Sequence, residues 1–224
     1  YFNGKFQARM YGKKVLTLIN TGHQIENEIY WRGFENCHEG LSTRIWAEIV
    51  RQTKPRCIWD IGASSGTYGV LAKAISPSSE VTFFEPIPKA VKMIEENLRL
   101  NKLNGIIYEA ALGDFTGDGE IFFVEGTDFA TSVTVNKNTT PTGSRSTKMG
   151  IKVLRADSII EQREALVPDL VKLDVETFEP EVLRGFGQRF PEKAIFLIEI
   201  LNESNAVQLK LFFPEISYNF YNID

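Results

Sequence analysis

The stretch Cys57-Ile58-Trp59-Asp60-Ile61-Gly62-Ala63-Ser64-Ser65-Gly66-Thr67 decides the fold. Residues 57–61 form a compact apolar run, which is typical of a strand buried on both faces. Two glycines follow, and the pattern predicts a helix that begins near Thr67. A glycine turn between a strand and a helix lets a ligand approach the backbone N–H groups closely. The segment therefore predicts a ligand-binding turn inside a βα unit.

A second acidic residue stands at the end of the next predicted strand. Residues 80–85 form that strand, and Pro86 follows Glu85. Glu85 lies about 20 residues beyond the turn, where a carboxylate can accept hydrogen bonds from both hydroxyls of a ribose. Together the two features predict a nucleoside-binding crevice. The alternative is a turn whose glycines only pack and whose Glu85 is solvated.

The spacing of the turn separates two classes of cofactor. A dinucleotide fingerprint carries three glycines, whereas this chain reads Asp-x-Gly-x-x-x-Gly and begins with an acid that would repel pyrophosphate. S-adenosylmethionine has a sulfonium, an α-amino group and no phosphate, so the turn favours it over NAD. We expect Asp60 to hold its amino group, directly or through water, and Tyr68 to lie along its methionine or ribose portion. The residues of this region that we expect to bind cofactor are Asp60, Gly62, Ala63, Ser64, Gly66, Tyr68, Glu85 and Pro86.

The remaining pattern predicts an α/β fold. After residue 55, apolar runs alternate with amphipathic stretches, as in βαβ units that build a mostly parallel, Rossmann-like sheet with helices on both faces. We expect strands over 57–61, 80–85, 105–112, 170–174, 194–199 and 218–223, and helices over 39–53, from 67, from 88, from 180 and over 206–213. Shorter strands over 121–124, 132–135 and 151–154 surround a polar segment, 136–150, that we expect to be mobile. Its basic residues, Lys137, Arg145 and Lys148, belong either to a solvated loop or to a site for an acidic group on the substrate.

Residues 1–38 differ from the rest and predict a small N-terminal lobe with a strand over 15–19, which can contact substrate or a second subunit. Residues 39–224 would form the cofactor-binding domain.

Composition excludes several classes of protein. The 224 residues carry a formal net charge of -4, which argues against a nucleic-acid binder. Two cysteines and two histidines are too few for a disulfide scaffold or a Cys/His zinc site, so we expect no metal and an inert, packed Cys57. No apolar run reaches the roughly 20 residues that span a bilayer, and the start has no signal pattern. These features predict a cytoplasmic protein.

The chain resembles the FkbM-type methyltransferases, a branch of the class I S-adenosylmethionine-dependent enzymes, from about residue 39 to about residue 200. Beside the glycine turn, blocks in the family's order are Phe84-Glu85-Pro86, Asn97, Ala110-Ala111-Leu112-Gly113-Asp114, Lys172-Leu173-Asp174-Val175-Glu176, Glu181-Val182-Leu183-Arg184-Gly185 and Ile198-Glu199-Ile200. The resemblance implies methyl transfer to a hydroxyl of a sugar, glycan or secondary metabolite in the cytoplasm of a bacterium. It also implies a further antiparallel strand, which we expect to be missing from this chain.

Two family positions differ here. Ser64 stands where the family usually has Asn, and Thr177 follows Glu176 where it usually has Gly. The resemblance adds Ala111 and Glu39 to the expected cofactor contacts, although Glu39 can equally favour the N-terminus of the helix that follows it.

An alcohol acceptor must lose its proton, and with so few histidines a carboxylate is the preferred base. Asp174 and Glu199 end predicted strands at the carboxyl edge of the sheet, and Glu176 follows closely, so these three are the predicted catalytic residues. The alternatives are a strand-end cap for Asp174 and an ion pair with Lys172 or Arg184 for Glu199. His38 is a further candidate base, although a surface histidine is the simpler interpretation.

The leading function is therefore an O-methyltransferase with a small-molecule or saccharide acceptor. An RNA methyltransferase, a cofactor-binding subunit without catalysis and a nucleotide-dependent oxidoreductase are the alternatives.

Overall fold

The computed structural model describes residues 2–11, 15–22, 24–37, 39–124, 133–134, 146–213 and 218–223. Its centre is a five-stranded sheet in the order β11-β10-β3-β4-β5, in which all neighbours are parallel. The strands are β3 (Cys57–Ile61), β4 (Glu80–Phe84), β5 (Ile106–Tyr108), β10 (Leu170–Leu173) and β11 (Ile195–Ile198). The predicted α/β sheet is confirmed.

The strand order places a switch point at the carboxyl end of β3. The chain runs from β3 to β4 and β5 on one side, then returns to build β10 and β11 on the other. Asp60 of β3 pairs in register with Lys172 of β10 and with Phe83 of β4. Open α/β sheets bind ligands in the crevice at such a point.

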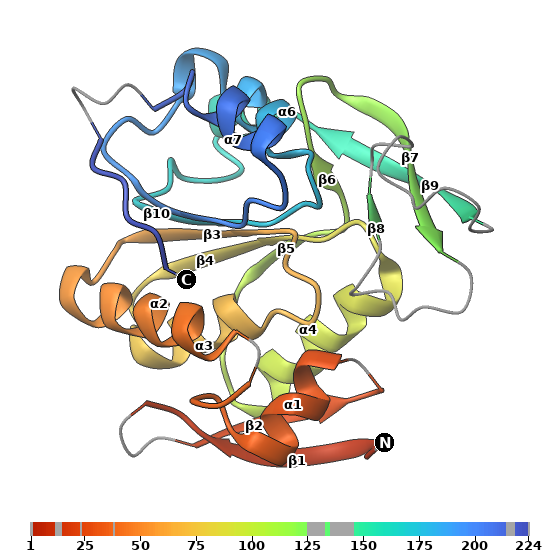
Figure 1. The fold of residues 1–224 in the computed structure, drawn as a ribbon, viewed down its shortest axis with the longest axis vertical. Helices are drawn as coiled ribbons and strands as arrows, with labels where there is room; N and C mark the ends of the chain where they lie inside the picture. The colour runs from red at the N-terminus through yellow and green to blue at the C-terminus, as the bar shows by residue number, and fades with distance from the viewer. Residues whose placement is uncertain are drawn as a thin grey trace.

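Alternation along the strands gives the sheet two apolar faces. Ile58, Phe83 and Leu170 face a core with α2 (Gly40–Thr53), α3 (Thr67–Ile75) and α4 (Pro88–Leu100). Trp59 and Leu173 face the opposite core with α5 (Ala156–Glu161), α6 (Glu179–Gly185) and α7 (Glu203–Leu209), and a 3₁₀ turn, Gly187–Arg189, follows α6. Figure 1 shows these two helical layers on opposite sides of the sheet.

The N-terminal segment lies outside the layer of α2, α3 and α4 (Figure 1). β1 (Gly4–Arg9) pairs antiparallel with β2 (Val15–Asn20), and α1 (Gln24–Arg32) follows. The predicted strand over 15–19 is present, whereas β1 and α1 were not predicted. Asn101, the residue directly after α4, holds β2 in place, because its side chain accepts from the Thr17 N–H at 2.8 Å and donates to the Thr17 carbonyl at 2.7 Å.

A second sheet has the order β6-β9-β7-β8. Its strands are β6 (Ala111–Leu112), β7 (Gly117–Val124), β8 (Val133–Thr134) and β9 (Ser146–Leu154). The single strand predicted over 105–112 is therefore wrong, because the chain changes sheet between Tyr108 and Ala111. β9 begins earlier than predicted and includes Lys148, which forms an ion pair with Glu120 at 2.7 Å. The rest of the polar segment, with Lys137 and Arg145, lies outside the described residues.

Two predictions near the C-terminal end need correction. The helix begins at Glu203 and ends at Leu209, so it lies earlier than the predicted 206–213. Residues 218–223 form no strand. The ring of Tyr218 packs edge-on against Phe213 at 5.0 Å, while Phe220 and Tyr221 are exposed, so the segment is anchored by side-chain packing and is not part of a sheet. Within the part of the chain described here, no helix has the length and apolar character needed to cross a bilayer.

Candidate active site

A cavity of about 350 Å³ opens at the carboxyl ends of β3, β4 and β10. Its walls include most of the glycine turn, Glu85 and Pro86, residues 174–176, Phe178, Glu199 and residues of α1. The volume lies at the lower end of the range of small-molecule sites, about 300–1,000 Å³. The cavity is therefore large enough for a small-molecule ligand at the switch point of the sheet.

The glycine turn is an irregular backbone segment that is held by several hydrogen bonds. Gly62, Ser64 and Gly66 all have left-handed φ angles, of 72°, 51° and 79°. The N–H groups of Gly62 and Ala63 both donate to the Phe84 carbonyl, at 3.0 and 3.1 Å. A Cβ on Gly62 would lie 1.8 Å from the Asp174 carbonyl oxygen, so only glycine fits between β3 and the end of β10. Gly62, Ala63 and Ser64 line the cavity, whereas Gly66 lies beneath it.

Glu85 lies where the sequence predicts a ribose-binding carboxylate. Its side chain is 5% exposed and accepts hydrogen bonds from the Ser64 N–H at 2.7 Å and the Ile87 N–H at 2.9 Å. Burial raises the pKa of Glu85 to about 7. Each of the two bonds goes to a different oxygen, and each carboxylate oxygen has a second lone pair. Glu85 can therefore hold the turn and still accept from two hydroxyl groups.

Asp60 lies behind the wall of the cavity. It is 1% exposed, and one of its oxygens accepts from the Gly69 N–H at 2.7 Å at the start of α3. The other oxygen is buried and has no hydrogen-bond partner among the described residues. Burial raises the pKa of Asp60 to about 6. Of the two predicted modes of contact with the cofactor's amino group, the one through water fits this position better.

Tyr68, Ala111, Pro86 and Glu39 all line the cavity. The Tyr68 hydroxyl is hydrogen-bonded to Glu39, and its ring lies 5.1 Å from the Lys172 ammonium. Glu39 stands directly before α2 and makes no side-chain cap to it. This geometry supports the cavity-facing interpretation of Glu39, while its electrostatic effect on the N-terminus of α2 stays a prediction.

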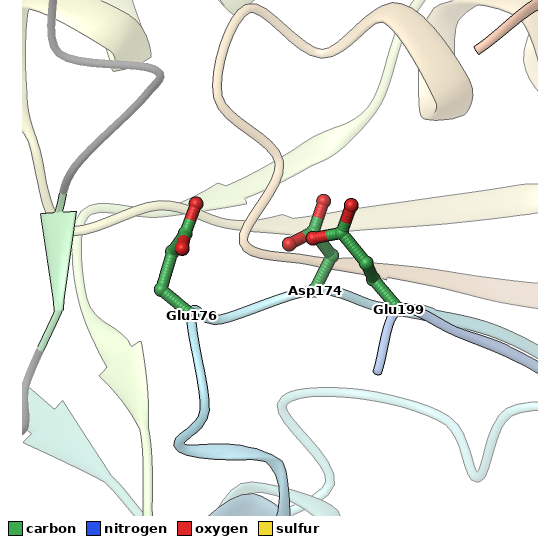
Figure 2. A group of neighbouring side chains, drawn as sticks. All are labelled: Asp174, Glu176 and Glu199. Carbon is green, nitrogen blue, oxygen red and sulfur yellow. The ribbon is translucent and has the colours of Figure 1, made fainter. Parts of the chain in front are cut away.

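The three predicted catalytic carboxylates lie together on the wall of the cavity. Asp174, Glu176 and Glu199 point the same way in Figure 2, and their closest oxygens all lie within 4.8 Å of one another. The Lys172 ammonium is 2.6 Å from Asp174, and Asp174 is also hydrogen-bonded to Glu199. Three carboxylates at this spacing could also hold a metal cation. In this structure the Lys172 ammonium supplies a positive charge next to Asp174.

The neighbours of each carboxylate set its proton affinity. Burial opposes the ionisation of Asp174, but the Lys172 charge and the bond from Glu199 outweigh it and lower the pKa of Asp174. Burial and the Asp174 charge raise the pKa of Glu199 to about 8. Burial, with the charges of Asp174 and Glu179, raises that of Glu176 to about 7. At neutral pH, the Asp174 carboxyl group is therefore ionised, and the Glu199 carboxyl group is mostly protonated.

The structure distinguishes the alternative roles of these residues. Lys172 pairs with Asp174, and Arg184 pairs with Asp114 and Glu181, so neither described cation is ion-paired to Glu199. The carboxylate that caps the loop after β10 is Glu179, which accepts from the Val175 and Thr177 N–H groups at 3.0 and 3.3 Å. The sequence reasoning overlooked this role, although an acid at the start of a helix was a visible signal.

Helix α1 and His38 also bear on the site. Residues of α1, including Gln24 and Glu28, line the cavity, but this helix was not predicted. The candidate base His38 lies outside the described residues.

The model of the methyltransferase FkbM domain matches residues 60–219. The chain belongs to the FkbM methyltransferase family. A curated relative, the hexuronic acid methyltransferase AglP of Haloferax volcanii, is 29% identical over 143 residues, or 64% of this chain and 55% of the relative. The chain thus spans about half the length of that relative.

Solved structures show the same fold. The S-adenosylmethionine-dependent methyltransferase of Agrobacterium tumefaciens has a TM-score of 0.54 at 12% identity, over 96% of this chain and 60% of that one. The tRNA (uracil-54, C5)-methyltransferase of Pyrococcus abyssi, solved with S-adenosyl-L-homocysteine, has a TM-score of 0.51 at 12% identity, over 96% and 39%. At this identity they establish the class I methyltransferase fold of the FkbM domain.

The two departures from the FkbM pattern fall at left-handed backbone positions. Ser64 has a φ of 51° where the family usually has Asn, a residue that tolerates this region well. Thr177 has a φ of 76° where the family usually has Gly. A β-branched residue is strained there, so the loop after β10 keeps the backbone of a glycine turn without the glycine.

Proposed function

We propose that the chain is an S-adenosylmethionine-dependent methyltransferase that methylates a hydroxyl oxygen of a saccharide or a related metabolite. The observation that carries the proposal is the cavity at the switch point, which combines a turn and carboxylate suited to a nucleoside with a cluster of proton-accepting carboxylates. Family membership supports methyl transfer, and the hexuronic acid methyltransferase supports a saccharide acceptor.

The residues of the nucleoside end fit this cofactor. Glu85 has lone pairs for the ribose hydroxyls, and the buried, unpartnered oxygen of Asp60 lies behind the turn, as a cationic amino group requires. Gly62, Ala63, Ser64, Tyr68, Pro86, Ala111 and Glu39 complete the wall, with Gly66 beneath it. When bound, the cofactor supplies an electrophilic methyl group on a sulfonium. The rigid turn contributes by orienting it, since positioning provides much of the acceleration in such displacements.

Glu199 is the proposed general base. A base is most effective when its pKa lies near the working pH, and Glu199 meets this condition at about 8. Asp174 is the weaker base because Lys172 holds its negative charge. Asp174 and Lys172 therefore orient Glu199, and Glu176 forms the neighbouring wall, where it can accept a hydrogen bond from a second hydroxyl of the acceptor.

The charges of the cavity favour a neutral acceptor group. Among the described residues that line it, six are acidic and Lys172 is the one base. A carboxylate on the acceptor near this cluster would meet like charges, whereas hydroxyls can donate to the carboxylates. The apolar side chains of Phe178 and Leu201 offer a surface for the ring of a sugar. The same acidic lining disfavours a nucleic-acid acceptor.

The N-terminal lobe, residues 1–38, is proposed to help enclose this acceptor, because α1 contributes to the wall. We place the reaction in the cytoplasm, where the free thiols of Cys37 and Cys57 would remain reduced. A bacterial source remains a prediction, since the curated relative is archaeal.

The test is methyl transfer from radiolabelled S-adenosylmethionine to a panel of methyl glycosides, with glucuronate and glucose as the matched charged and neutral members. We expect an alkali-stable methyl ether on a neutral sugar. Methyl transfer to glucuronate alone, as an alkali-labile ester, would contradict the assignment of a hydroxyl acceptor. Methyl transfer to no member of the panel would contradict the proposal that the acceptor is a saccharide.

A further inference from the structure

The underside of the glycine turn is attached to the N-terminal segment by a buried amide. Asn97 of α4 is fully buried, and its Nδ2 donates to the Ser65 carbonyl at 2.9 Å. The Oδ1 of the same side chain accepts from the Ile19 N–H of β2 at 2.8 Å. One side chain thus links the turn to the strand that lies outside α4.

A carboxyl group from α1 contacts side-chain hydroxyls of the same segment. Glu26 is fully buried, and its Oε1 accepts from the Thr67 hydroxyl at 3.4 Å. Glu26 is also hydrogen-bonded to Ser65, whose hydroxyl lies 3.0 Å from that of Thr67. Its second oxygen, Oε2, has no hydrogen-bond partner among the described residues. Two parts of residues 1–38 are therefore linked to the turn, β2 through Asn97 and α1 through Glu26.

This segment of the turn is also a wall of the cavity. Ser65 and Thr67 line it, and the adjacent Ser64 N–H is the group that binds Glu85. The turn has three left-handed φ angles and belongs to neither a helix nor a strand. Backbone hydrogen bonds to Phe84 and within the turn fix part of this conformation, and side-chain contacts from neighbouring elements complete it.

We propose that Asn97 and Glu26 are positioning residues, through which the N-terminal segment holds the glycine turn in its cofactor-binding conformation. This inference rests on the proposed function, because it concerns the affinity of that same site for the cofactor. Neither residue lines the cavity, so each acts through Ser65 and Thr67.

The first test uses Asn97→Asp, which keeps an acceptor for the Ile19 N–H and replaces the donor to the Ser65 carbonyl with an oxygen. The matched control is Asn101→Ala, which removes both bonds to Thr17 and the bond to the Asn97 main-chain carbonyl, but leaves the Asn97 side chain in place and touches no residue of the turn. We expect Asn97→Asp to weaken binding of S-adenosylhomocysteine about tenfold, the effect of one hydrogen bond of about 1.4 kcal/mol, and Asn101→Ala to leave Kd within about twofold. Equal Kd values in both variants would overturn the proposal.

The second test compares Glu26→Gln with Glu26→Ala, and uses Asn27→Ala, on the same helix, as control. Glutamine can still bond both hydroxyls, so its Kd should stay within about threefold of wild type, while alanine weakens it about tenfold. A Gln variant as weak as the Ala variant would contradict the inference.

Hydrogen exchange of the unliganded protein gives a readout that does not depend on activity. In Asn97→Asp, the amides of residues 62–67 should exchange faster, while those of β4 keep their wild-type rates. Unchanged exchange in the turn would overturn the proposal. If wild type itself binds no S-adenosylhomocysteine, the proposed function fails instead, and the exchange experiment still decides whether the turn is held in this way.

Discussion

Thr177 provides a quantitative test of the loop that carries Glu176. Its φ of 76° costs a non-glycine residue about 1–2 kcal/mol, and its hydroxyl is buried without a partner among the described residues. A buried hydroxyl group without a hydrogen-bond partner costs about 1–3 kcal/mol of stability, and we use the lower value, about 1 kcal/mol, because Thr177 is only half-buried. Glycine restores about 0.5–1 kcal/mol of conformational entropy to the unfolded chain. Thr177→Gly should therefore raise the free energy of unfolding by about 1–2.5 kcal/mol.

The assay is urea unfolding followed by the fluorescence of the tryptophans, one of which, Trp59, is fully buried in the core. Thr177→Ala is the matched control, because it removes the hydroxyl and keeps a Cβ at the strained position. It should show a gain smaller than that of the Gly variant. The affinity for S-adenosylhomocysteine should not change, since Thr177 does not line the cavity. A Gly variant that is less stable than wild type, or no more stable than the Ala variant, would refute the reasoning.

Three further predictions concern single groups. The rate of single-turnover methyl transfer should rise about tenfold between pH 7 and pH 9, because Glu199, with a pKa of about 8, acts as a base only when ionised. The Glu199→Gln variant should be slower by about 10²–10⁴-fold and should lack this rise. A variant that keeps the rise would exclude Glu199 as the general base. The Glu85→Ala variant leaves the Ser64 and Ile87 N–H groups without their acceptor. Its affinity for S-adenosylhomocysteine, measured by calorimetry, should fall at least about tenfold. An unchanged Kd would rule out the assignment of Glu85 to the ribose. Burial raises the pKa of Cys57 to about 12, so this thiol should react with iodoacetamide only after unfolding, and rapid labelling of the native protein would contradict its placement in the core.

The sequence was informative where local chemistry determines the structure. Residues 57–61 are apolar apart from Asp60, which predicts a strand buried on both faces, and the glycines after it indicate the turn. The carboxyl edge of a parallel sheet then brings Glu85, Asp174 and Glu199 to one crevice, whatever the details of their connections.

The failures arose where tertiary contacts override the local pattern. Helix α1 was missed because buried polar residues, Glu26 and Asn27, occupy positions that an amphipathic helix would fill with apolar ones. Residues 105–112 are mostly apolar, and a single strand was predicted through Glu109, although this charged residue lies where the chain moves from β5 to β6. The role of Glu179 depends on the left-handed turn at Glu176 and Thr177, which the non-glycine sequence conceals.

Equilibrium dialysis of the purified chain with S-adenosylhomocysteine, in the presence and absence of NAD, tests the central claim most directly. We expect saturation at one molecule of S-adenosylhomocysteine per chain, unaffected by NAD, since the cavity offers Glu85 for a ribose, and Lys172, its one described basic residue, is held by Asp174. Absence of binding, or displacement of S-adenosylhomocysteine by NAD, would contradict the account.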